Sequence, residues 1–274
     1  MSAVQPYRIV EALCASGKGS EALKEDRLVT TADFVAVIDG ATSSGPIDGR
    51  PGGIVAAETV ETVVRTLPAD TTAGDFARRA SEALAARIGA WPDDSRMRPS
   101  AAVVVWSVAR QEVWRIGDCH FRLDDRVFAG EKDVDKVSYA FRCAVVKARL
   151  RLGLSSVEAE RRIKTLEQPF MPLVSLQHAF LNVDSADPLA YGALCGKPVP
   201  SRFVEVQSTV GVRTVVLCSD GFLDPAATLD QGLEAIDTVR RDDPLMIERV
   251  TGSRPFPPDA RFFDDTTYIR LALA

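Results

Sequence analysis

Apolar residues along the chain fall into short runs whose spacing changes from strand-like to helix-like. The first runs are β-rich, and the two that follow place their apolar residues at helical spacing. Thr72 and Asp75 have the spacing of a capping pair in front of the second of these helices. The pattern predicts strands at residues 7–14, 27–30 and 34–38, followed by helices at 54–67 and 75–91.

The remaining chain continues in blocks of one element type. Residues 101–108 predict a strand buried on both faces, which forms a hairpin with 112–116. Residues 131–168 predict mostly helix, with Ser155 and Glu158 as a capping box, and 169–200 are a loop-rich excursion with many Pro and Gly residues. Further strands are expected at 203–206, 214–218 and 267–273, and further helices at 229–241 and 244–251.

This order of elements favours one fold class. Strands and helices do not alternate, so we expect an α+β protein with antiparallel sheets rather than a doubly wound parallel sheet. We expect a single domain over residues 1–274, with a helical and loop-rich insertion at about 131–200 that forms a flap.

Composition narrows the class of protein. The 274 residues are 46% hydrophobic and carry a formal charge of −5, which is ordinary for a folded domain and gives no general attraction to nucleic acid or anionic membranes. No apolar run has the length of about 20 residues that a membrane span needs, and the first ten residues lack the pattern of a signal peptide. Five cysteines without a CxxC pair indicate reduced thiols. We expect a cytoplasmic monomer.

Several kinds of catalytic site are excluded by missing motifs. The two histidines, His120 and His178, are far apart and no cysteine cluster exists, so a zinc site is not expected. The chain lacks a GxxxxGK[ST] phosphate loop, a GxGxxG fingerprint and a GxSxG nucleophile elbow. His120 either moves a proton beside Asp118 or is an exposed residue at a strand end, and His178 is predicted to be a packing residue. If the chain is an enzyme, we therefore expect its chemistry to depend on carboxylates.

Acidic residues recur where apolar strands end. Each acid alone is more often a loop residue, but their repetition suggests that strands of one sheet bring several carboxylates to one rim. Clustered carboxylates repel one another, so a cation must neutralise them, and oxygen ligands without His or Cys favour Mg²⁺ or Mn²⁺. The acids are Asp39, Asp118, Asp220 and Asp264, and the pair Glu25-Asp26 precedes its strand.

These motifs, in this order, resemble the metal-dependent Ser/Thr protein phosphatases of the PP2C (PPM) family. The resemblance spans about residues 8–273, and its most specific piece is Leu-Cys-Ser-Asp-Gly-Phe-Leu-Asp at 217–224. It implies an α-β-β-α sandwich, in which two packed antiparallel sheets are flanked by helices. It also implies a centre of two Mn²⁺ or Mg²⁺ ions, with a third ion held more weakly.

The resemblance also implies roles for individual residues. Asp39 would bridge the two ions. The carbonyl of Gly40 and, through water, Glu25 would hold one ion, while Asp220 and Asp264 would hold the other.

Two further acids have implied roles beside the two main ions. Asp26 would orient metal-bound water, and Asp118 would serve the third ion. The catalytic set is thus Asp39, Asp26 and Asp118. Of the neighbouring acids Asp264 and Asp265, the family pattern favours Asp264 as the ligand.

The sequence departs from the family pattern around substrate recognition. The phosphate-binding arginine of some members is Glu21 here, and Lys18, Lys24 and Arg50 are alternative candidates. The residues after Asp39-Gly40 read Ala-Thr-Ser-Ser, and Asp118 is followed by Cys-His. These changes leave the acids of the metal centre in place.

The expected function is hydrolysis of phosphoserine and phosphothreonine esters by direct attack of a water activated by two metal ions. Its partner would be a phosphorylated protein substrate. Two alternatives stay open: a catalytically inactive phosphatase-like binding module, and a phosphatase of a small phosphorylated metabolite. We expect the excursion at 169–200 to lie near the metal rim and to influence which substrate fits.

Overall fold

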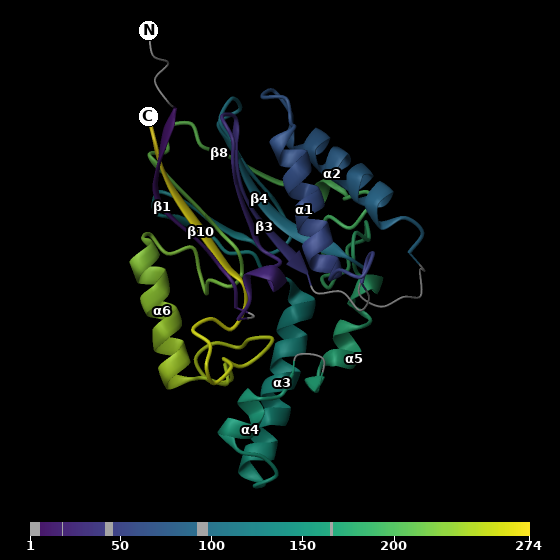
Figure 1. Ribbon diagram of the computed structural model, residues 1–274, viewed down its shortest axis with the longest axis vertical. Helices are drawn as coiled ribbons and strands as arrows, with labels where there is room; N and C mark the ends of the chain where they lie inside the picture. Colours follow the sequence, from purple (N-terminus) through teal and green to yellow (C-terminus); the bar gives the residue numbers. More distant parts are fainter. Residues whose placement is uncertain (1–5, 18, 42–45, 92–97, 165–166) are drawn as a thin grey trace.

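Two antiparallel sheets packed face to face form the centre of the computed structural model of this protein (Figure 1). The structure describes residues 6–17, 19–41, 46–91, 98–164 and 167–274. The expected α+β class with two packed antiparallel sheets is confirmed. No helix in the described part of the chain has the length and apolar character needed to cross a membrane.

Each sheet has five strands, and chain order does not follow sheet order. The first sheet runs β1 (Tyr7–Ala15), β10 (Thr266–Leu273), β9 (Thr214–Cys218), β6 (His120–Leu123) and β7 (Arg126–Phe128). The second runs β2 (Arg27–Thr30), β3 (Phe34–Ala41), β4 (Ser100–Ser107), β5 (Glu112–Ile116) and β8 (Glu205–Ser208). The β6–β7 hairpin was not predicted. Strand β8 overlaps the strand predicted at 203–206 but begins and ends two residues later.

Strand β3 shows why the central runs are continuously apolar. Val35 and Val37 pack in the core between the sheets, while Ala36 and Ile38 pack beneath the outer helices. Because successive side chains of a strand point to opposite faces, a strand covered on both faces needs apolar residues at every position. The strand continues past the predicted end at Ile38, so Asp39 lies within it.

Helices cover the outer face of each sheet (Figure 1). The second sheet is covered by α1 (Gly52–Arg65) and α2 (Ala73–Ile88), and the first by α6 (Leu229–Asp242). The predicted cap of α2 is confirmed, because the Thr72 hydroxyl accepts a 3.1 Å hydrogen bond from the backbone N–H of Asp75.

The predicted insertion contains three helices near one end of the sandwich (Figure 1). They are α3 (Asp133–Arg151), α4 (Val157–Arg161) and α5 (Met171–Val174). The predicted capping box at Ser155 is wrong by one residue, since Ser156 is the residue that accepts the N–H of Ala159.

The helix predicted at 244–251 is wrong, and the segment is an irregular loop. Met246 has a φ of 52°, which breaks a right-handed helix. The carboxylate of Asp243 accepts the N–H groups of residues 247–249, and buried Arg142 of α3 donates to the carbonyls of Leu245, Met246 and Gly252. These side chains satisfy the backbone groups that a helix would otherwise pair.

Candidate active site

The acids singled out in the sequence meet at one end of the sandwich, and they come from both sheets. Asp39 lies in β3 and Asp118 directly follows β5, both in the second sheet. Asp220 follows β9 and Asp264 precedes β10 in the first sheet. The expectation that strands of a single sheet bring them together is therefore wrong, because the two sheets end at a common rim.

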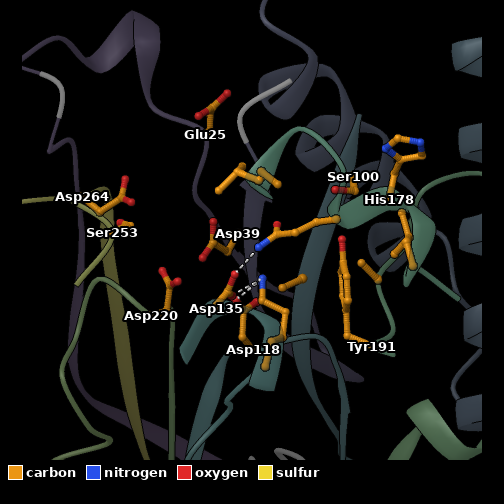
Figure 2. A pocket seen from close by; sticks show the side chains of 18 of the residues that line it. Glu25, Asp39, Ser100, Asp118, Asp135, His178, Tyr191, Asp220, Ser253 and Asp264 are labelled. Atoms are coloured by element: carbon orange, nitrogen blue, oxygen red, sulfur yellow. Dashed lines mark hydrogen bonds and ion pairs between the residues drawn. The ribbon is translucent and has the colours of Figure 1, made fainter. Parts of the chain in front are cut away.

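A pocket of about 210 Å³ lies at this rim. In Figure 2, Asp39, Asp118, Asp135 and Asp220 gather at its centre, with Tyr191 to one side. All the proposed ligands line it: Glu25, Asp39, Gly40, Asp118, Asp220 and Asp264. Asp26 does not line the pocket and is 1% exposed beneath it.

Glycine at position 40 permits a close approach of β3 to the start of α1. A Cβ atom on Gly40 would lie 2.3 Å from the carbonyl oxygen of Gly53, and one on Gly53 would lie 2.3 Å from Oε1 of Glu25. Side chains at these two positions are therefore sterically excluded. The Asp39-Gly40 dipeptide here continues a strand against a helix and does not form a turn.

The central carboxyl groups resist ionisation. Burial raises the pKa of Asp39 well above its usual range, and the neighbouring Asp220 and Asp26 raise it further. The pKa of Asp220 rises to about 7, chiefly through burial and then through Asp118 and Asp264. A hydrogen bond from Asp39 partly offsets this rise. Burial and mutual repulsion thus both favour the protonated forms of Asp39 and Asp220.

Asp26 lies beneath these acids and also favours its protonated form. Burial raises its pKa to about 8, while the nearby hydroxyls of Ser219 and Thr267 oppose the rise. Neither hydroxyl meets hydrogen-bond geometry, and both carboxyl oxygens of Asp26 lack a partner among the described residues. A buried acid with unpaired oxygens is suited to holding a proton or a water at the floor of the pocket.

A lysine pairs with the acid that follows β5. Nζ of Lys132 lies 2.7 Å from Oδ2 of Asp118 and 3.1 Å from Oδ2 of Asp135. Burial alone would raise the pKa of Asp118, but the Lys132 ammonium outweighs it and the pKa is lowered. Asp118 therefore differs from Asp39 and Asp220 in having a cation of the chain beside it.

An arginine pairs with the acid that precedes β10. Nη2 of Arg254 lies 2.9 Å from Oδ2 of Asp264, and Nε of Arg254 is buried without a hydrogen-bond partner among the described residues. Asp265 also lines the pocket, but its two carboxylate oxygens accept the backbone N–H groups of Gly17 and Glu25. The two acids thus differ in their partners, because Asp264 pairs with an arginine and Asp265 with backbone N–H groups.

Two of the residues suggested for phosphate binding, Lys24 and Arg50, pair with acids outside the pocket. Lys24 pairs with exposed Glu21 at 2.6 Å, and Arg50 pairs with Glu58 at 2.7 Å. Neither Lys24 nor Arg50 lines the pocket. Lys18 lies outside the described residues, as do residues 42–44 of the segment after Gly40.

Sequence reasoning missed the basic and aromatic residues of the pocket. Arg98, Lys132 and Arg254 line it, together with Tyr139 and Tyr191. No local motif marks these residues, because each reaches the pocket from a loop or helix outside the strand ends. Lys132 and Arg254 are identified by their ion pairs with Asp118 and Asp264, and the other three by their place in the lining of the pocket.

The excursion at 169–200 contributes one wall of the pocket. Phe170, Met171, Val174 and Leu181 line the same pocket as the acids. His178 also lines it, so the prediction of a packing residue is wrong (Figure 2).

His120 is buried beside Asp118 and binds the backbone of the loop that follows β7. It is 6% exposed, and its Nδ1 accepts the backbone N–H of Gly130 at 2.7 Å. The exposed alternative for His120 is therefore wrong. Burial also lowers the pKa of His120, which favours the neutral ring that can accept this hydrogen bond.

The donor set fits hard divalent ions in its chemistry. Its members are oxygen atoms of carboxylates and one carbonyl, the ligands that Mg²⁺ and Mn²⁺ prefer. Among the described residues, no group of three or more Asp, Glu, His or Cys side chains is already arranged to hold an ion. Two of the acids instead pair with cationic side chains, Asp118 with Lys132 and Asp264 with Arg254, so an ion at Asp264 would have to replace the ion pair with Arg254.

Comparison with known proteins finds similarity at the level of fold. No family profile and no curated protein matches the sequence. The catalytic domain of the serine threonine protein phosphatase PstP, in complex with two manganese ions, matches with a TM-score of 0.50 and 18% identity over 98% of each chain. The serine/threonine phosphatase PstP/Ppp from Mycobacterium tuberculosis matches with a TM-score of 0.48 and 19% identity, over 97% of this chain and 98% of that one. The PPM Ser-Thr phosphatase MsPP from Mycobacterium smegmatis matches with a TM-score of 0.48 and 17% identity, over 97% of this chain and 99% of that one. The chain therefore has the fold of the PPM (PP2C) serine/threonine phosphatases.

Proposed function

We propose that this protein is a metal-dependent phosphatase of phosphoserine and phosphothreonine esters. One observation carries the proposal: five acidic residues from separate elements line one pocket in a fold shared with such phosphatases. The acids are Glu25, Asp39, Asp118, Asp220 and Asp264.

Two Mn²⁺ or Mg²⁺ ions would be held by oxygen atoms of this set. Asp39 and Gly40 with Glu25 would hold one ion, and Asp39 with Asp220 and Asp264 the other. When bound, the ions would supply Lewis acidity, which lowers the pKa of a water molecule and offsets charge on the phosphoryl oxygens. The raised pKa of Asp39 and of Asp220 supports this assignment, because an ion relieves the same repulsion that a proton relieves here.

Residues around the acids would position the substrate. Arg254 is the strongest candidate for binding the phosphoryl group, because it lies in the pocket and its Nε lacks a partner among the described residues. Once an ion holds Asp264, the guanidinium would be free to bind phosphate in a bidentate manner. Asp26, which is buried next to Glu25, would act as a positioning residue that orients metal-bound water, as the resemblance implies.

The walls of the pocket support a phosphorylated protein side chain as substrate. The excursion supplies apolar contacts from Phe170, Met171 and Leu181, which a peptide next to a phosphorylated residue could cover. The acids and Arg254 would then hold the phosphoryl group at the inner end of the pocket.

The test is hydrolysis of p-nitrophenyl phosphate and of a phosphothreonine peptide by the metal-depleted chain. We expect no turnover in chelator and recovery when Mn²⁺ or Mg²⁺ is added, with Asp39→Asn inactive under both conditions. Full turnover after verified metal removal, or equal activity of Asp39→Asn, would overturn the proposal.

A second candidate is a phosphatase-like module that binds a phosphorylated partner without turnover. The ion pair Arg254–Asp264 favours it, because it occupies an acid that the metal centre would use. Phosphopeptide binding by calorimetry, with no hydrolysis at saturating Mn²⁺, would support this candidate over the enzyme.

A further inference from the structure

The ammonium group of Lys132 lies between two carboxylates at one side of the pocket. Its Nζ is 2.7 Å from Asp118 and 3.1 Å from Asp135, and all three side chains are at most 22% exposed. Such short contacts at low exposure place a full positive charge where a bound cation would contact Asp118.

The surrounding fold holds Lys132 in this position. A Cβ atom on Gly130 would lie 2.2 Å from the carbonyl oxygen of Asp118, so the chain passes directly over Asp118 two residues before the lysine. The carbonyl of Lys132 accepts the N–H of Asp135 in the first turn of α3, and the ammonium lies 5.4 Å from the centre of the Tyr191 ring. Backbone and side chain are thus both constrained toward Asp118.

We propose that Lys132 is a built-in cation that fills the position at Asp118, so that this acid binds no metal ion. The proposal rests on the proposed function, because it concerns the same metal centre. It replaces the third, weaker ion that the resemblance implies at Asp118 with an ammonium group supplied by the chain.

The charges around the pocket support this difference between the acids. A metal ion at Asp118 would have to displace the Lys132 ammonium, which contacts two carboxylates. The displaced ammonium would stay close to the metal ion and repel it. Asp39 and Asp220 form no ion pair with a described residue. Those two acids still require an added cation, whereas Asp118 already has one.

The test compares the number of Mn²⁺ ions bound per chain, by equilibrium dialysis with metal analysis, for the wild type and Lys132→Gln. We expect the variant to bind one more ion than the wild type, and Lys132→Gln combined with Asp118→Asn to lose that ion again. Lys136→Gln is the matched control, because Lys136 lies one helical turn away, is 56% exposed and pairs with Glu131. It should bind as many ions as the wild type.

An unchanged ion count in folded Lys132→Gln would overturn the proposal. If this variant fails to fold, as judged by circular dichroism, the single variant Asp118→Asn decides: an unchanged count supports the proposal, and the loss of one ion contradicts it. The wild-type count separately tests the proposed function. Two ions bound per wild-type chain agree with the proposed function, and zero bound ions contradict it. This holds whatever the difference between the wild type and the variant.

Discussion

The backbone N–H of Glu25 donates a 2.6 Å hydrogen bond to Oδ2 of Asp265, which lies 240 positions later in the chain. The other carboxylate oxygen of Asp265 accepts the N–H of Gly17 at 2.9 Å. The start of the chain is therefore tied to the entry of β10 by one carboxylate, while the preceding Asp264 faces the pocket. Two adjacent aspartates thus have different roles.

The first prediction separates these two aspartates. Asp265→Asn places an amide group against two buried N–H donors, and we expect it to lower the free energy of unfolding by about 2–4 kcal/mol. Asp264→Asn should cost about 1 kcal/mol but lower Mn²⁺ affinity at least ~100-fold, since even outer-shell partners of metal ligands are worth about 10–100-fold. Denaturant unfolding and Mn²⁺ titration on the same samples check both. The reverse assignment would appear as weak metal binding in Asp265→Asn alone.

The second prediction concerns the pH dependence of stability without metal. In the folded chain the pKa of Asp220 is about 7 and that of Asp26 about 8, whereas an unfolded aspartate titrates near ~3.9. Between about pH 4 and 8 the folded state therefore binds more protons than the unfolded state. Stability should fall as pH rises through this window.

Melting temperatures in chelator from pH 5 to 8 check this expectation. Asp220→Asn should flatten the fall, because its amide does not titrate. Saturating Mn²⁺ should also reduce it, because the ion takes over the role of the proton. A melting temperature that rises with pH in chelator, in both wild type and variant, would contradict the assigned pKa directions.

The third prediction concerns Arg254. Arg254→Gln removes a charged hydrogen-bond donor from the pocket, and we expect KM to rise about 10–100-fold for p-nitrophenyl phosphate and for a phosphopeptide alike. Mn²⁺ affinity should rise, because a positive charge leaves Asp264. Arg261→Gln is the control, since Arg261 is 49% exposed and pairs with Asp237. Unchanged KM values in Arg254→Gln would assign phosphate binding to another residue.

The fourth prediction concerns the wall formed by the excursion. Met171→Ala with Leu181→Ala should raise KM for a phosphothreonine peptide several-fold more than for p-nitrophenyl phosphate, because the larger substrate covers more of this wall. Leu176→Ala is the control, since Leu176 is 57% exposed in the same excursion and does not line the pocket. Equal effects on both substrates would show that the excursion does not select between them.

The sequence pattern was sufficient to predict most of the strands and the acids that line the pocket. The strand at 214–218 was predicted with its observed ends, because burial on both faces leaves a continuous apolar run in the sequence. The helix cap at Thr72 was also predictable from the sequence, because it depends on two residues only three positions apart. The recurring acids at strand ends marked the pocket because strand ends of packed sheets lie at a common rim.

The sequence by itself thus determined the α+β class and most of the elements, because these depend on local periodicity, whereas the sandwich and the roles of the acids were implied by the family resemblance. Tertiary structure alone decided how the acids differ. Asp264 meets Arg254 while Asp265 meets Glu25, and Asp118 meets Lys132 across a hairpin. The loop at 244–251 likewise depends on Arg142 from α3. Such pairings join residues from different elements, at separations from ten positions to 240, and no local pattern encodes which charged side chain will reach a given carboxylate.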